Sequence, residues 1–151
     1  MVAVTPSFAQ SLYVVIPGEP VAQGRPRAFR MGGAIRVVDP SKSRSWKGVA
    51  QVHAIEALSH HEPRTVPLFK DCALRMAVDA YFTRKHFPKR VGAERQPKPS
   101  RPDCDNVGKA CADALNGVAY ADDAQVVELV IRKWYAAEGE GPRVEIVVSP
   151  C

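Results

Sequence analysis

The chain has 151 residues, of which 46% are hydrophobic and 25% charged, and its formal net charge is +5. These values exclude a chain that is disordered throughout, and the length suits one compact domain better than two. The longest apolar runs fall far short of the roughly 18 residues that a transmembrane helix needs. We therefore expect a single domain over residues 1–151, with a flexible tail over residues 1–10, no membrane partner and no secretory signal.

Basic residues are concentrated in the first two thirds of the chain. Residues 1–102 carry 17 Lys and Arg against 7 Asp and Glu, whereas residues 103–151 carry 4 against 9. The segments 25–47 and 84–101 each contain seven basic residues and one acidic residue. A solvated surface is the alternative explanation for such segments. Basic groups beside a carboxylate cluster instead favour a protein that holds a polyanion and binds a metal ion that acts on it.

The first half of the chain predicts two strands and a helix. A strand over 11–16 leads into a loop over 17–33 that is rich in Gly, Pro and Arg, and a short strand over 34–38 follows. Residues 41–58 contain no proline and are compatible with a helix. The side chains that we expect on its buried stripe are Trp46, Val49, Ala50, His53 and Ala57.

The second half predicts a strand, a long loop, a helix and two more strands. The strand over 72–82 alternates: its buried face holds Leu74, Met76, Val78, Ala80 and Phe82, and its wet face holds Arg75, Asp79 and Tyr81. A long basic loop over 83–102 precedes an amphipathic helix over 106–116, which Asp105 or Asn106 can cap and Gly117 can end. We expect the strands over 124–134 and 143–148 to pair as a hairpin, which completes a single α/β (α+β) domain.

The four cysteines are Cys72, Cys104, Cys111 and Cys151, and no two of them have the spacing CxxC. We expect free thiols in a reduced, cytoplasmic protein. A zinc site built from these thiols and the histidines would need an unfamiliar spacing, so none is expected.

Two pairs of aspartates flank the helix predicted over 106–116. Asp103 and Asp105 come just before it, and residues i and i+2 of an extended segment point the same way, so both carboxylates can face one point. Asp122 and Asp123 follow the helix, at the entry to the next strand. Because the helix is roughly 16 Å long, the two pairs meet only if that strand returns alongside it.

Carboxylates gathered at one point repel one another unless a cation neutralises them. Oxygen ligands without Cys or His select Mg²⁺ or Mn²⁺, and these ions activate water and offset charge on a phosphodiester. Lys109, one turn after Asp105, can reach the carboxylates or a phosphate. Structural roles are the alternatives: helix capping for the first pair, a turn for the second pair, and an ion pair of Lys109 with Asp105 or Asp113.

The stretch RPDCDNVGKACADALNGVAYADDAQVVEL, residues 101–129, resembles the motif of the RusA family of Holliday-junction resolvases. That motif has D-x-D-N-x-x-K, then a helix with D-A-L, then D-D-x-Q-V-V. Upstream, GEPVAQGRPRAFR (residues 18–30) resembles the Gly- and Arg-rich N-terminal segment of the phage-type members. The loop over 83–102 is longer than in the compact members of the family.

The resemblance implies a mixed β-sheet flanked by two main helices. It also implies a homodimeric endonuclease with Mg²⁺ or Mn²⁺ at each active site, no small-molecule cofactor, and a place in the bacterial cytoplasm, often encoded by a prophage. Since a four-way junction has two-fold symmetry, a two-fold dimer provides one site for each of two nicks. By motif position, the metal ligands are Asp103, Asp105 and Asp123, the catalytic lysine is Lys109, and the supporting residues are Asp122 and Asn106.

The implied partner is branched DNA, above all the four-way junction, held by its phosphates and recognised by shape. The alternatives are a nuclease for other branched or flap DNA, a catalytically silent junction-binding protein, and a basic regulator whose acidic cluster only caps a helix. The predicted DNA contacts are Arg25, Arg27, Arg30, Arg84, Lys85, Lys89, Arg90, Lys98 and Arg101.

Overall fold

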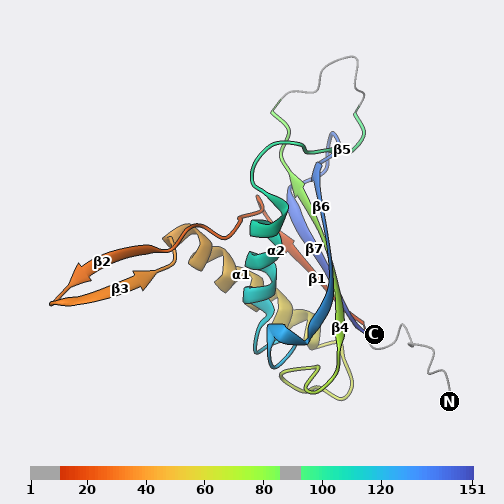
Figure 1. The fold of residues 1–151 in the computed structure, drawn as a ribbon. Helices are drawn as coiled ribbons and strands as arrows, with labels where there is room; N and C mark the ends of the chain where they lie inside the picture. Colours follow the sequence, from red (N-terminus) through yellow and green to blue (C-terminus); the bar gives the residue numbers. More distant parts are fainter. Residues whose placement is uncertain (1–10, 86–92) are drawn as a thin grey trace.

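The computed structural model describes residues 11–85 and 93–151, which form a single α+β domain (Figure 1). The predicted tail over 1–10 lies outside the described residues. In chain order the elements are β1 (Leu12–Pro17), β2 (Arg27–Met31), β3 (Ala34–Val38), α1 (Ser41–Leu58), β4 (Leu74–Phe82), β5 (Gln96–Pro97), α2 (Cys104–Leu115), the 3₁₀ turn η2 (Asp123–Gln125), β6 (Val126–Tyr135) and β7 (Arg143–Pro150).

A five-stranded mixed sheet in the order β1-β7-β4-β6-β5 forms the body of the molecule. β4 is central: it pairs parallel with β6 on one side and antiparallel with β7 on the other. β1 adds to β7, and the two-residue β5 adds to β6. Both helices lie on the same side of this sheet (Figure 1).

The predicted hairpin of the last two strands is wrong. β6 and β7 do not pair with each other, because β4 lies between them. The chain leaves β6 at Ala136, whose amide donates to the carbonyl of Phe82 at the end of β4, and then crosses to the far side of that strand. The central place of β4 gives both of its edges a hydrogen-bonding partner.

Two short strands fall inside segments that were predicted to be loops. β2 lies in the predicted loop over 17–33 and pairs antiparallel with β3 through the two-residue turn Gly32-Gly33, whose φ angles are +60° and +80°. Such a turn matches the twist of a hairpin. Neither strand shows an apolar–polar alternation, so periodicity alone missed β2. β5 lies within the predicted loop over 83–102.

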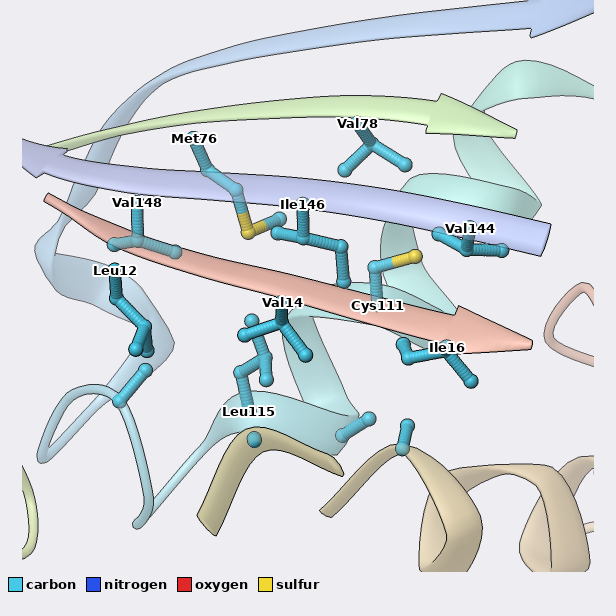
Figure 2. Close-up of a cluster of buried hydrophobic side chains, with 14 of the residues drawn as sticks. Leu12, Val14, Ile16, Met76, Val78, Cys111, Leu115, Val144, Ile146 and Val148 are labelled. Carbon is cyan, nitrogen blue, oxygen red and sulfur yellow. The ribbon is translucent and has the colours of Figure 1, made fainter. Parts of the chain in front are cut away.

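The core fills the space between the sheet and the two helices. Figure 2 shows side chains of β1, β4 and β7 pointing from the sheet towards Cys111 and Leu115 of α2. The predicted inner face of β4 is confirmed, but Tyr81 on its opposite face is also buried, because Arg95 and Arg143 cover its ring. The buried residues of α1 are Ser43, Trp46, Ala50, Ala54 and Leu58. The predicted stripe is therefore wrong at Val49, which is exposed, and its members His53 and Ala57 are only half-buried.

The contact between α2 and β6 depends on a glycine. A Cβ atom at Gly108 would lie 2.1 Å from Cδ1 and 3.1 Å from Cγ1 of Ile131. At Gly48, inside α1, nothing lies within 4 Å of the corresponding position. The absence of a side chain at Gly108 therefore lets α2 lie directly on β6 and fixes the height of the helix above the sheet.

Alanine at these two glycines tests that packing. Either substitution gains about 1 kcal/mol of helix propensity, but at Gly108 overpacking costs about 1–3 kcal/mol. We expect Gly48→Ala to raise the free energy of unfolding, measured in urea. The free energy of unfolding of Gly108→Ala should be about 1–3 kcal/mol lower than that of Gly48→Ala. Equal changes in the two variants would contradict the close contact of α2 with β6.

Within residues 11–85 and 93–151, no helix is both long and apolar enough to cross a membrane.

Candidate active site

Asp103 and Asp105 lie at the N-terminus of α2. Asp103 occupies the N-cap position, not Asp105 or Asn106 as the sequence predicted, and its side chain makes no capping hydrogen bond. Both aspartates are exposed. Neither carboxylate forms a hydrogen bond or an ion pair with the described part of the chain, so both are available to a ligand.

Lys109 follows one turn later and is exposed. It forms none of the ion pairs found among the described residues; Asp113, one of its possible partners, instead pairs with Lys47 of α1 at 3.2 Å. The Lys47 ammonium also contacts Asp39 at 3.2 Å and lowers the pKa of that carboxyl group. The ammonium group of Lys109 therefore remains available one turn along α2 from Asp105.

The segment that precedes β2 runs across this end of α2. The amide of Gln23 donates to the carbonyl of Asn106 at 2.9 Å. Further back, the Glu19 carboxylate accepts hydrogen bonds from the amide (3.2 Å) and the hydroxyl (2.8 Å) of Thr83, just after β4. The GEPVAQG sequence thus ties the start of α2 to the end of β4.

Two lysines hold the segment directly before Asp103. Lys98 donates to Ser100 Oγ at 2.7 Å and to the carbonyl of Arg101, and Lys133 of β6 donates to the carbonyls of Ser100 (2.8 Å) and Pro102 (2.6 Å). The ammonium group of Lys98, a predicted DNA contact, therefore forms intramolecular hydrogen bonds in this structure. Lys133 was missed by the sequence analysis, because nothing in its spacing connects it with residues thirty positions earlier.

Asp122 and Asp123 lie in the turn between α2 and β6. Asp122 caps η2 by accepting from the amide of Ala124 at 2.9 Å. Gln125 completes the turn: its side-chain oxygen accepts from the amide of Asp122 at 3.0 Å, and its side-chain nitrogen donates to the carbonyl of Cys72 at 3.0 Å. Asp122 is therefore engaged in the turn, whereas the carboxylate of Asp123 is exposed and makes no hydrogen bond within the described residues.

Two buried side chains, Tyr120 and Cys111, pack beneath the turn between α2 and β6. The hydroxyl of Tyr120 donates to the carbonyl of Ala112 at 2.7 Å, and burial, followed by the charge of Asp123, raises the pKa of Tyr120. Burial raises the pKa of the neighbouring Cys111 thiol to about 12. Neither group ionises near neutral pH, so both serve packing, and the four cysteines are free thiols as expected.

One chain does not bring the two aspartate pairs together. They lie at opposite ends of α2, whose 12 residues span roughly 18 Å, and β6 returns along the helix with its first residue next to Asp123 and its last residues near Asp103. In the described ranges, no three His, Cys, Asp or Glu side chains lie close enough to share a metal ion. The condition set by the sequence, a strand returning alongside the helix, is met, yet it leaves the pairs apart.

The predicted DNA contacts fall into two regions. Arg27 and Arg30 lie on the exposed β2, with Arg25 just before it. Arg84 lies over the ring of Tyr135 at 5.4 Å, near Lys85 and Arg101, which are exposed. Lys89 and Arg90 lie outside the described residues.

The fold and the aspartate-lysine motif together define a family of DNA endonucleases. The chain matches the model of the endodeoxyribonuclease RusA family over residues 17–149, and it belongs to that family. Among curated proteins it is similar to the uncharacterized protein YqaN of Bacillus subtilis (strain 168), with 37% identity over 135 residues, which cover 87% of this chain and 90% of YqaN.

Proposed function

We propose that the protein is a Mg²⁺-dependent, structure-selective endodeoxyribonuclease of the bacterial cytoplasm, which resolves Holliday junctions by paired, symmetric nicks during DNA recombination and repair. One observation carries the proposal. The match to the RusA family spans residues 17–149 and includes the aspartate-lysine motif. Its first two aspartates, Asp103 and Asp105, are exposed at the start of α2 and form no hydrogen bond or ion pair with the described residues.

The available donors fit a hard divalent cation. Asp103, Asp105 and Asp123 offer carboxylate oxygens, the ligand type that Mg²⁺ and Mn²⁺ prefer. We assign metal binding to these three residues. The chemistry that Mg²⁺ supplies when bound is activation of a water molecule and neutralisation of charge that develops on the phosphate.

The protein's own groups position the DNA and balance its charge. Lys109 lies one turn from Asp105, where its ammonium can stabilise negative charge on the scissile phosphate or the leaving oxygen. Asn106 directly follows Asp105 in α2, and its carbonyl accepts a hydrogen bond from the amide of Gln23. Asp122 acts indirectly, since it caps the turn that presents Asp123.

A second copy of the chain completes the site in this proposal. If two α2 helices lie antiparallel about a two-fold axis, the Asp105 end of one faces the Asp123 end of the other. Each site then contains Asp103 and Asp105 from one protomer and Asp123 of the partner subunit. A homodimer thus supplies two identical sites, as two symmetric nicks require.

The surface beside Asp123 supports that dimer. Val127 and Leu129 of β6 are exposed there, at 66% and 45%. β5 pairs with β6 only at Trp134 and Tyr135, so within the described residues the rest of the outer edge of β6 has no strand partner. An apolar strand edge of this kind readily accepts a second chain.

Cleavage of a labelled four-way junction in Mg²⁺, compared with a linear duplex of matching sequence, tests the proposal. We expect paired nicks at symmetric positions in the junction alone and no cleavage in EDTA. Cleavage of flaps or forks in preference to junctions would instead identify a nuclease for other branched DNA. Tight binding of an intact junction in both Mg²⁺ and Mn²⁺ would contradict the enzymatic function and leave a junction-binding protein.

A further inference from the structure

The β2–β3 hairpin stands away from the sheet and the helices (Figure 1). Every residue of its two strands is exposed apart from Val38, which is half-buried. An isolated two-stranded hairpin is only marginally stable in water. A protruding hairpin with exposed apolar side chains therefore calls for a binding partner.

The hairpin carries apolar and cationic groups on both of its faces. Phe29 lies directly opposite Arg36 on one face, and Arg30 lies directly opposite Ile35 on the other. The four large apolar side chains are 46–68% exposed; they are Phe29, Met31, Ile35 and Val37. Between Glu19 and Asp39 the sequence has no acidic residue and four arginines.

This composition favours DNA over the other partners that an apolar hairpin can have. A second copy of the hairpin would bring three arginines against three, and like charges repel. Guanidinium groups pair with phosphates, and apolar side chains stack on or wedge between bases. The tip is narrow, because Gly32 and Gly33 have no side chains.

The base of the hairpin is fixed to α2 at two points, by Gln23 at the end that carries Asp103 and Asp105 and by Lys47 at Asp113 in the last turn. The amide of Gly24 donates to Ser43 Oγ at 3.1 Å, one residue after Gln23, which bonds to Asn106. At the other strand, Asp39 pairs with Lys47, which also pairs with Asp113 of α2. DNA held by the hairpin is therefore held in register with the aspartates.

We propose that the hairpin is a wedge for the branch point of the DNA substrate, with its arginines on phosphates and Phe29 and Met31 against bases that are not stacked there. The inference rests on the proposed function and adds how branched DNA is distinguished. In a continuous duplex the base faces are covered by their neighbours, so the apolar side chains gain nothing from it. The arginines contact phosphates of either DNA.

Two double variants separate these contributions in a binding experiment without divalent ions, so that no DNA is cut. We expect Phe29→Ser/Met31→Ser to weaken binding of a labelled four-way junction about tenfold, and to leave binding of the matching linear duplex unchanged. Arg30→Gln/Arg36→Gln should weaken both DNAs alike and reduce the slope of log affinity against log salt by about 2. Val52→Ser, which removes an equally exposed apolar side chain from α1, is the matched control and should change neither affinity.

A 2-aminopurine base at the branch point reports the wedge directly. Its fluorescence should rise when the wild-type protein binds and stay low with Phe29→Ser/Met31→Ser at saturating protein. Equal losses of junction and duplex affinity in that variant would overturn the wedge. The wedge would also be overturned if the only defect of that variant were a change from dimer to monomer, or a loss of binding to anionic vesicles.

The same measurements separate this inference from the proposed function. If the fluorescence rise depends on the hairpin but the protein never cleaves the junction in Mg²⁺, the nuclease function is contradicted and the wedge is supported. If Phe29→Ser/Met31→Ser cleaves and binds the junction like the wild type, the wedge is contradicted and the nuclease function is supported.

Discussion

Asp105→Asn should abolish junction cleavage and leave junction binding intact. The substitution keeps the shape of an exposed side chain that forms no hydrogen bond or ion pair with the described residues, so the fold is not expected to change. Under the proposed function, it removes one negative ligand of the divalent cation. Because transition-state charge on the phosphate then loses its counterion, we expect a loss of at least about 10²–10³-fold in the cleavage rate.

The matched control is Glu56→Gln, which removes one negative charge in the same way at an exposed carboxylate on α1. Single-turnover cleavage of a four-way junction in Mg²⁺ gives the rates, and gel-shift titration in EDTA gives the affinities. If Asp105→Asn cleaves at the wild-type rate, Asp105 binds no catalytic metal. If both variants lose activity alike, the effect is one of general charge and not of the site.

The sequence predicted the local structure of this chain far better than its strand order. Residues 41–58 form a helix with the predicted bounds, and the inner face of β4 is buried as its alternation indicated. Local patterns record which side of an element is buried. They do not record which strand lies beside which, and so the two C-terminal strands were paired with each other when β4 in fact lies between them.

The pairing of β2 with β3 and the lysine before the site were missed for a related reason. The strand predicted over 34–38 matches β3, but β2 has no buried face and no alternation, so the sequence placed it in a loop. Lys133 reaches Pro102 because β6 runs back along α2. That contact follows from the topology and not from spacing along the chain.

The candidate site was predicted in part: its residues follow from the local sequence, but their arrangement depends on the topology. The motif singled out Asp103, Asp105, Lys109 and Asp123 as candidate site residues, and the side chains of all four are exposed. Their distance from one another depends on the length of the helix and on the direction of the strand after it. Because β6 begins at the far end of α2, the two aspartate pairs stay a helix length apart in one chain. We therefore proposed that a second chain completes the metal site.

Mixing inactive chains tests that conclusion and should restore activity. A dimer of one Asp105→Asn chain and one Asp123→Asn chain has both substitutions in one composite site and none in the other. Random assortment makes about half of the dimers mixed, so about one quarter of all sites are intact. We expect each mixed dimer to nick one strand only, which converts a plasmid with an extruded cruciform into nicked circles, whereas the wild type makes the paired cuts that linearise it.

The control mixture combines Asp103→Asn with Asp105→Asn chains. Both residues belong to the same half of the site, so every composite site in a mixed dimer carries one substitution and no activity should return. If each chain instead built its own site, neither mixture would recover, since every site in both mixtures would lack one ligand. Recovery in the first mixture and not in the second is therefore the pattern that only a site shared between two copies of α2 produces.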